Sequence, residues 1–301
     1  MTDIFITGSH SFVGKQLIKK LSNSIYNIIC VDINEKNSDN FINADICDPK
    51  IDELIPQNSI VVHLAAISKP SICDKNLKLA FDVNVNGTIN LYNAAKKKNV
   101  KNFIFSSSEW VYDQKNNKSN LFDEHSLIDI SNINSVLPYT KIVAEKYLKI
   151  HKSTVPVNIL RFGIIYGPRE EDIQHWSAVD YIFHQIKYKN EIEVGSLNTS
   201  RCFIHVEDIV DGIIAVLENN SSNLYNISGS KLISLNEIIN LSSLILNKSP
   251  NIIEKNSLNS SVRGASNNYA IKNLNWYPKI DLKNGLISLN KFLNSEFYKN
   301  D

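Results

Sequence analysis

The sequence predicts an α/β fold, built on a doubly wound parallel sheet with a smaller C-terminal α/β lobe. In the first half of the chain, short runs rich in β-branched residues alternate with amphipathic, helix-like stretches. This alternation is typical of successive β–α–β units. The strand-like runs are almost entirely apolar, as expected of strands that are covered by helices on both faces.

The expected elements follow one another along the chain. Strands are expected at 4–7, 28–31, 60–64, 103–106 and 158–162, with helices at 15–21 and 87–98. Residues 113–137 are polar and rich in Asn and Ser, which predicts a long loop. Beyond Gly167-Pro168 the alternation breaks, with helix-like stretches at 176–188 and 206–218 and a strand at 224–227 that returns to the sheet.

Composition and charge exclude several classes of protein. The chain has 301 residues, 43% of them hydrophobic and 21% charged, which is typical of a soluble globular protein. Its net charge of +1 gives no reason to expect nucleic acid or a membrane as a partner. No apolar run approaches the ~20 residues of a membrane-spanning helix. The first strand follows Met1 almost directly, which leaves no room for a signal peptide, so we expect a cytoplasmic protein.

The four cysteines show no paired spacing. Cys30, Cys47, Cys73 and Cys202 are therefore interpreted as reduced thiols in a reducing compartment. They form no zinc signature, and no metal site is predicted.

The turn after the first strand has the form of a phosphate-binding loop. Gly8 permits a tight turn, and Gly14 permits the helix to pack closely on the strand. Ser11 stands where a glycine would let the backbone approach the phosphate, and its hydroxyl could donate to phosphate instead. Phe12 and Val13 open the helix, whose N-terminal amides and dipole favour a pyrophosphate. The sequence therefore predicts a dinucleotide at this turn of a Rossmann-type sheet.

An acidic residue closes the second strand and selects among dinucleotides. Asp32 follows Gly14 by 18 residues. A carboxylate at this point accepts hydrogen bonds from the adenosine ribose and repels a 2′-phosphate. The predicted cofactor is therefore NAD, not NADP.

Further landmarks occur in the order found in one known family. They are Ala44-Asp45-Ile46, His63-Leu64-Ala65-Ala66, Asn84-Val85-Asn86-Gly87-Thr88, Ser106-Ser107-Ser108 with Val111-Tyr112, Leu160-Arg161-Phe162, Tyr166-Gly167-Pro168-Arg169, residues 201–208, Tyr225-Asn226-Ile227 and Leu274-Asn275-Trp276-Tyr277-Pro278. With them, nearly the whole chain resembles the extended short-chain dehydrogenase/reductase family. The resemblance is to its NAD-dependent nucleotide-sugar epimerases, dehydratases and ketoreductases.

The resemblance implies a domain organisation and a set of binding residues. Residues 1–168 would form the NAD-binding Rossmann domain, with 200–228 returning to it, and 169–199 and 229–301 the lobe that binds a nucleotide-diphosphate sugar. It implies that Arg201 and Arg263 hold the diphosphate, a task suited to the bidentate arginine side chain. Other cofactor contacts implied by the resemblance are Asp45 on the adenine amine, Ile46, Leu64, Ala65, Ala66 and Asn84. It also implies a homodimer or higher homo-oligomer, formed through helices at about 84–98 and 139–151.

The family's catalytic tyrosine is missing from its expected position. Relatives carry a Tyr four residues before a Lys on one helix; the Tyr acts as base and the Lys binds the nicotinamide ribose. Glu145, four residues further on, identifies Lys141 as that lysine, and counting back gives Leu137. Tyr139 lies only two positions from Lys141, about 200° around a helix, so it faces away unless the helix starts late. Pro138 suits a first helical turn and leaves that alternative open.

Three side chains remain as catalytic candidates. They are Ser108, Glu109 and Lys141. Ser108 can hydrogen-bond the reacting oxygen, and Glu109 could serve as the base. Dehydratases of the family carry a glutamate at the position of Trp110, so dehydration is disfavoured. Ile164 stands where some epimerases use an Asn to bind the sugar nucleotide.

Several functions remain open on these grounds. The first is dehydrogenation at carbon 4 of a nucleotide-linked sugar, with GDP-heptose or a nucleotide-hexose as candidate substrate, in bacterial capsule or surface polysaccharide synthesis. A 4-epimerase and a 4-ketoreductase are alternatives. An answer of another class is a catalytically reduced protein that binds NAD or a sugar nucleotide.

Overall fold

A computed structural model of the chain describes residues 1–34, 38, 40–112, 121–152, 154–169 and 176–295. Its largest feature is a sheet of seven strands, all paired in parallel, in the order β12-β7-β5-β4-β1-β2-β3. The strands are β1 (Asp3–Thr7), β2 (Asn27–Asp32), β3 (Phe41–Asn43), β4 (Ile60–His63), β5 (Asn102–Ser108), β7 (Val157–Phe162) and β12 (Asn223–Ile227). The order reverses between β1 and β4, which confirms the predicted doubly wound sheet and creates the crevice where such sheets bind ligands.

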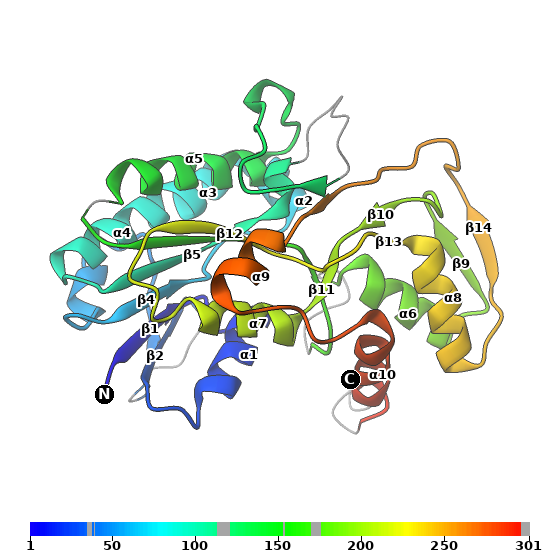
Figure 1. Cartoon of the computed structure of the whole chain (residues 1–301), viewed down its shortest axis with the longest axis horizontal. Helices are drawn as coiled ribbons and strands as arrows, with labels where there is room; N and C mark the ends of the chain where they lie inside the picture. Colours follow the sequence, from blue (N-terminus) through cyan, green and yellow to red (C-terminus); the bar gives the residue numbers. More distant parts are fainter. Residues whose placement is uncertain (35–37, 39, 113–120, 153, 170–175, 296–301) are drawn as a thin grey trace.

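Helices cover both faces of this sheet (Figure 1). On one face lie α1 (Phe12–Leu21) and α7 (Val206–Ala215), which bury apolar side chains such as Leu17 and Ile213 against the strands. On the other lie α4 (Thr88–Lys97) and α5 (Val136–His151), which bury Leu91 and Leu148. The short helices α2 (Pro70–Lys75) and α3 (Leu77–Phe81) lead through a π-helical turn, Asp82–Gly87, into α4.

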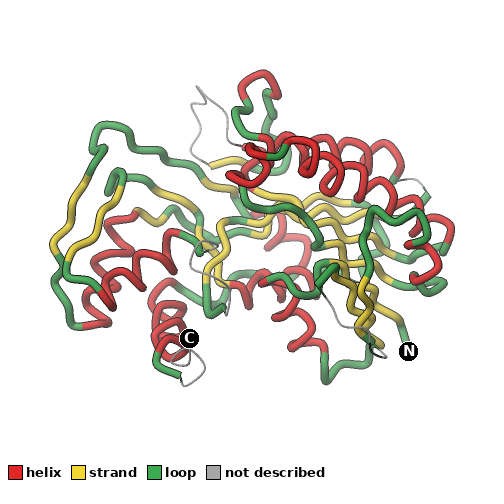
Figure 2. The backbone as a smooth tube through the Cα atoms, turned by 180° about the vertical axis from the view of Figure 1, so that it is seen from behind, coloured by secondary structure: helices red, strands yellow, loops and turns green. Residues whose placement is uncertain are grey.

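A second apolar cluster lies beside the sheet. It is enclosed by α6 (Ala178–Tyr188), α8 (Leu235–Leu246) and α10 (Leu282–Leu293). The strands β9 (Glu191–Val194) and β14 (Asn251–Glu254) pair in parallel at its outer edge, as Figure 2 shows from behind. Burial of Phe183, Ile186 and Leu286 gives this part of the chain a core of its own.

Short strand pairs connect the sheet to this second cluster. They are β8 (Ile164–Tyr166) with β11 (Phe203–His205), β10 (Ser200–Arg201) with β13 (Ile233–Ser234), and β6 (Leu121–Phe122) with β15 (Gly264–Ala265). Helix α9 (Asn268–Leu274) packs beside β12, and Trp276 belongs to the core of the sheet, although both lie in the range expected for the second lobe.

The structure corrects several expected boundaries. Helix α1 begins at Phe12, before the expected residue 15, because Ser11 already caps it. The expected loop at 113–137 contains strand β6 and a 3₁₀ turn at Ile130–Asn132, and α5 begins within it at Val136. Residues 113–120 of that loop lie outside the described residues. In the described part of the chain, none of the helices has the length and apolar character needed to cross a membrane.

Candidate active site

The phosphate loop runs from the carboxyl end of β1 into α1. Gly8 adopts a φ of 73°, and a Cβ there would lie 2.6 Å from the backbone nitrogen of Ala65, so only glycine fits. The Ser11 Oγ accepts a hydrogen bond of 3.1 Å from the Gly14 amide and caps the helix. By helix geometry, the amides of Phe12 and Val13 have no acceptor within α1. These groups fit a dinucleotide pyrophosphate.

Asp32 lies beside this loop at the end of β2. Its two carboxylate oxygens accept hydrogen bonds from the backbone amides of His10 and Asn34, each at 3.1 Å. A carboxylate keeps further lone pairs after two such bonds, so it can still accept from a ribose. Asp45 is exposed and accepts from the Cys47 amide at 2.9 Å, and its neighbour Ile46 is buried.

A chain of buried polar groups supports the segment after β4. His63 lies between the hydroxyls of Thr7, at 2.8 Å, and Thr88, at 3.0 Å. Burial, and secondarily the charge of Lys141, lower the His63 pKa to about 3, so the ring is neutral at physiological pH.

Asn84 holds the next part of this segment. It accepts from the Ile67 amide at 2.8 Å and donates to the Ile67 carbonyl at 3.0 Å and the Thr140 hydroxyl at 3.1 Å. It therefore fixes the backbone that follows Leu64, Ala65 and Ala66. This places the predicted cofactor residue Asn84 in a supporting position.

Ser108 ends β5, and Lys141 reaches the same strand two residues earlier. The buried Lys141 Nζ donates to the Ser106 carbonyl at 2.7 Å and lies 4.8 Å from the centre of the Phe105 ring. Burial lowers the Lys141 pKa to about 8, with a smaller opposing effect from Glu145. The Ser108 side chain is half-buried, and its Oγ accepts from the Trp110 amide at 3.2 Å.

The position of the missing tyrosine is apolar. Leu137 is 3% exposed and packs with Cys73 and Ala80. Tyr139 is 40% exposed, and its ring centre lies 6.1 Å from that of Phe81. Because α5 already begins at Val136, Tyr139 is held within the helix and does not share the buried face of Lys141.

Two of the predicted catalytic and binding residues contact one another. The buried carboxylate of Glu109 forms an ion pair with Arg263, whose Nη2 lies 3.8 Å from Oε1. The Arg263 guanidinium also lies 4.8 Å from the centre of the Trp110 ring. Glu109 and Arg263, predicted as a base and as a diphosphate ligand, therefore form a contact that their sequence positions do not show.

The second predicted arginine lies on the neighbouring strand. Arg201 donates to the carbonyl of Ser261 at 2.6 Å and to its hydroxyl at 3.0 Å. The Arg263 amide donates to the Ser200 carbonyl at 3.1 Å, so the two arginines are held side by side. Sequence spacing alone does not show this pairing, because 62 residues separate the two positions.

Sequence reasoning missed Arg169 and Asp180. The Arg169 guanidinium lies 3.7 Å from the centre of the Phe12 ring in the phosphate loop and 3.2 Å from a carboxylate oxygen of Asp180 on α6. Burial raises the Asp180 pKa to about 6, although Arg169 opposes this effect. Arg169 belongs to the family segment Tyr166-Gly167-Pro168-Arg169, but only the fold brings its side chain to the phosphate loop.

Known proteins resemble the chain in sequence over most of its length. Residues 4–228 match the NAD dependent epimerase/dehydratase family. A putative UDP-glucose 4-epimerase of Methanocaldococcus jannaschii is 28% identical over 298 residues, 94% of this chain and 95% of that protein. A UDP-glucuronate 4-epimerase of Thermodesulfobacterium geofontis is 28% identical over 236 residues, 76% of this chain and 70% of that protein.

Solved structures share the fold. UDP-glucose 4-epimerase of Thermotoga maritima, solved with UDP-glucose, superposes with a TM-score of 0.86 at 24% identity and covers 97% of this chain and 98% of its own. UDP-glucuronic acid 4-epimerase of Bacillus cereus, solved with NAD, superposes with a TM-score of 0.85 at 24% identity, covering 100% and 98% of the two chains.

These matches confirm the resemblance and the predicted Rossmann-type fold, and the family's dependence on NAD agrees with the predicted cofactor. They also confirm the prediction of an enzyme of the nucleotide-sugar epimerase and dehydratase kind. The family match covers more than half of the chain, and its description fits the phosphate loop and the acidic residue beside it. The chain belongs to the NAD dependent epimerase/dehydratase family.

Proposed function

We propose that this enzyme oxidises carbon 4 of a nucleotide-linked sugar, with NAD held along the carboxyl edge of the sheet. One observation carries the proposal. The phosphate loop, Asp32, Ser108 and Lys141 come from four separate segments of the chain, and the structure aligns the first three at the carboxyl ends of β1, β2 and β5. Lys141 reaches the same edge through its bond to the Ser106 carbonyl. Ligands of open α/β sheets bind at this edge.

Each candidate side chain has a separate role in the proposed reaction. NAD, held by the phosphate loop, Asp32 and Lys141, would supply the hydride acceptor for carbon 4. Ser108 hydrogen-bonds the sugar oxygen, Lys141 holds the nicotinamide ribose, and Glu109 accepts the hydroxyl proton. Arg201 and Arg263 bind the diphosphate, and Arg263 lies beside Glu109 as its ion-pair partner. This division follows the proposed domains, with 1–168 and 200–228 for NAD and 169–199 and 229–301 for the sugar nucleotide.

Release of the 4-keto sugar is the first candidate for the net reaction. The apolar surroundings of Leu137 provide no phenol next to Lys141, so the acid–base group that standard relatives use twice per turnover has no counterpart there. A dehydrogenase needs only one proton transfer from the sugar. The candidate substrates are GDP-heptose and a nucleotide-hexose, and the proposed setting is surface polysaccharide or capsule synthesis, which consumes such donors.

A 4-epimerase is the second candidate. It is favoured by the two relatives that are 28% identical, whose names are those of 4-epimerases. An epimerase must oxidise the sugar and then return the hydride to its other face. Glu109 would then have to give back the proton that it takes.

A direct experiment separates these outcomes. The purified protein is denatured and any released dinucleotide identified by mass spectrometry. The native protein is then mixed with NAD and with GDP-, UDP-, dTDP- or CDP-sugars, while NADH is followed by absorbance and sugar products by NMR. A keto sugar with accumulating NADH supports the dehydrogenase, and a 4-epimer without NADH supports the epimerase. Absence of both NAD binding and turnover would contradict the proposal.

The proposal also includes self-association through α4 and α5. Two apolar side chains of α5 face outward, with Tyr139 40% and Ile150 68% exposed. Burial of such a surface against a second copy would remove apolar area from water. Light scattering during gel filtration should therefore give twice the monomer mass or more, and Ile150→Glu should shift the mass toward that of the monomer.

A further inference from the structure

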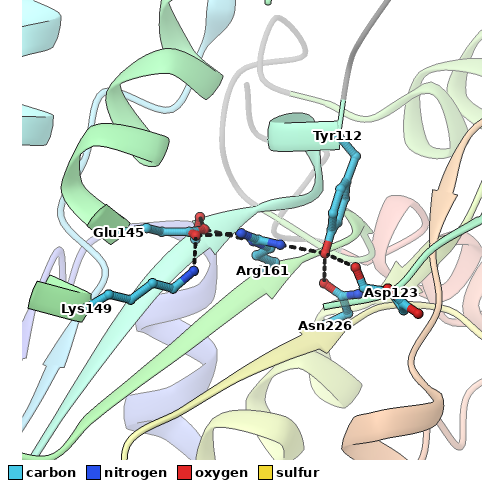
Figure 3. A network of polar contacts seen from close by, with 7 residues as sticks. Tyr112, Asp123, Glu145, Lys149, Arg161 and Asn226 are labelled. Atoms are coloured by element: carbon cyan, nitrogen blue, oxygen red, sulfur yellow. Dashed lines mark hydrogen bonds and ion pairs between the residues drawn. The ribbon is translucent and has the colours of Figure 1, made fainter. Parts of the chain in front are cut away.

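A buried polar network joins Glu145, Arg161, Tyr112 and Asn226 (Figure 3). Its centre is a bidentate ion pair between Arg161 on β7 and Glu145 on α5. Arg161 Nε donates to Oε1 at 2.9 Å, and Nη2 donates to Oε2 at 2.6 Å. The two side chains are only 2% and 3% exposed.

Both partners are charged. Burial alone would lower the Arg161 pKa and raise that of Glu145, but their mutual attraction and hydrogen bonds reverse both effects. The net result is a raised pKa for Arg161 and a lowered pKa for Glu145. A buried ion pair is seldom more stable than a well-packed apolar pair, and its retention in a core suggests a role in fixing geometry.

The pair fastens α5 to β7, and Ser107 fastens the same carboxylate to β5, one helical turn away from Lys141. Ser107 donates to Glu145 Oε1 at 2.6 Å, and Ser107 lies opposite Arg161 in the strand register. Lys141 itself donates to the carbonyl of Ser106. Two successive residues of β5 therefore hold two residues of α5 that are four apart, which sets both the rotation and the height of the helix.

The network continues toward the segment that carries Arg263. Arg161 Nη1 donates to the Tyr112 hydroxyl at 2.7 Å, and the same oxygen lies 2.9 Å from both the Asp123 carbonyl and Asn226 Oδ1. Asn226 Nδ2 donates to the Ser266 carbonyl at 3.0 Å. Figure 3 shows Tyr112 approaching Arg161 from the side opposite Glu145.

We propose that Glu145, Arg161 and Ser107 are positioning residues that hold the Lys141 ammonium where the cofactor ribose meets the end of β5. Tyr112 and Asn226 secure Arg161 on the side opposite Glu145. The inference rests on the proposed function, because it assumes that Lys141 contacts the cofactor. Glu145 acts through both its hydrogen bonds and its charge, since its carboxylate and the Cys73 thiol are the groups that raise the Lys141 pKa, opposite the neutral His63.

The test compares variants that keep the fold. Ser107→Ala removes one hydrogen bond and Tyr112→Phe removes one hydroxyl, whereas Glu145→Gln also removes the charge. The matched control is Asn158→Ser, at the other end of the same two strands. The buried Asn158 donates to Asn102 Oδ1 at 2.9 Å near the amino ends of β7 and β5, whereas Lys141 contacts β5 near its carboxyl end. Circular dichroism and thermal melts report whether each variant is folded.

The measurement is the NAD dissociation constant across a range of pH. Ser107→Ala and Glu145→Gln are expected to weaken NAD binding about tenfold, because a small displacement of a binding group is costly. Glu145→Gln is also expected to lower, by about one unit, the pH at which NAD binding is lost. Ser107→Ala should not change this pH, because it leaves the charge of Glu145 in place. Tyr112→Phe should weaken NAD binding less than Ser107→Ala and Glu145→Gln do. Asn158→Ser should leave the NAD dissociation constant unchanged, even where it lowers thermal stability as much as those two variants do.

Three results would overturn this inference. One is NAD binding by folded Ser107→Ala and Glu145→Gln with the wild-type constant and pH profile. Another is an equal loss of NAD binding in Asn158→Ser, which would show that stability alone is measured. The third is a wild-type protein that binds no NAD, which would overturn the proposed function and this inference with it.

Discussion

At the scale of single residues, Lys141 combines burial with a charge. Its ammonium has a carbonyl partner on β5, an aromatic ring and a carboxylate one turn away, yet burial still lowers its pKa to about 8. A lysine with such a pKa changes its charge close to physiological pH. The protonation state of Lys141 should therefore be visible in cofactor binding.

We predict that NAD affinity falls as the pH rises through about 8, because Lys141 loses its proton there. The neutral amine attracts an anionic dinucleotide less than the ammonium does. Titration of NAD binding against pH by calorimetry measures this dependence. Lys141→Met, which has no titrating group, should bind NAD weakly at every pH; a profile as steep as that of the wild type would assign the dependence to another residue.

Asp32 gives a second prediction at this scale. Asp32→Ala should weaken NAD binding about tenfold and leave NADP binding less affected, because the carboxylate that repels a 2′-phosphate is lost. Competition of NAD and NADP for the protein, followed by fluorescence, measures the preference. Asp48→Ala removes an exposed carboxylate of the same charge nearby and serves as the control. An unchanged preference in Asp32→Ala would remove Asp32 from the cofactor site.

At the scale of elements, the start of α1 serves both stability and binding. Ser11 caps the helix, and the first amides of that helix are the groups proposed to face the pyrophosphate. Other helices of the described residues have similar caps outside the proposed cofactor site. In α8, Ser234 and Glu237 form a complete capping box far along the sequence from the phosphate loop.

We predict that Ser11→Ala and Ser234→Ala each lower the free energy of unfolding by about 1 kcal/mol. Only Ser11→Ala should also weaken NAD binding, because only its helix faces the cofactor. Urea denaturation and NAD titration of the two variants give the comparison. Equal NAD affinity in both variants would mean that the geometry of the α1 N-terminus does not matter for binding.

Elements with local signals could be predicted from the sequence, and elements formed by distant contacts could not. The apolar strands of the sheet and the turn at Gly8 follow from patterns a few residues long. Strand β3 was missed because it has three residues with exposed ends at the sheet edge. The start of α5 was obscured because its cap is tertiary: Asp74, from α2, accepts from the Val136 amide at 2.9 Å. The pairing of β6 with β15 joins segments some 140 residues apart, which no local pattern records.

The same distinction holds for the candidate site. Asp32, Ser108 and Lys141 occupy fixed positions relative to predicted strands and helices, so they could be placed from spacing. The contact between Glu109 and Arg263 depends on how the chain returns after 154 residues and could not be inferred. The proposed base Glu109 is therefore a carboxylate with a cationic neighbour, which sequence spacing does not show.

At the scale of the whole molecule, Arg169 joins the phosphate loop to the second apolar cluster. Its guanidinium contacts Phe12 on one side and Asp180 on the other. Asp180 is buried and also accepts from the Gly167 amide at 2.9 Å. A single side chain therefore connects the cofactor side of the molecule to α6, the first helix of the second cluster.

We predict that Arg169→Met lowers the free energy of unfolding by about 3 kcal/mol, because it leaves the Asp180 carboxylate buried without its cation. Combining it with Asp180→Asn should recover much of the loss, since the double variant buries no charge. Chemical denaturation of the two single variants and the double variant gives the coupling. Strict additivity of the two single effects would show that Arg169 and Asp180 do not act as a pair.

The proposed function requires that hydride pass between NAD and carbon 4 of the sugar. A sugar nucleotide that supports turnover in the panel is prepared with deuterium at carbon 4 and incubated with the enzyme, and the dinucleotide is recovered for mass spectrometry. We expect deuterium on the nicotinamide ring, retained in accumulated NADH for a dehydrogenase and present only transiently for an epimerase. Turnover with the deuterium kept on carbon 4 throughout, or released to water without reaching the dinucleotide, would contradict it.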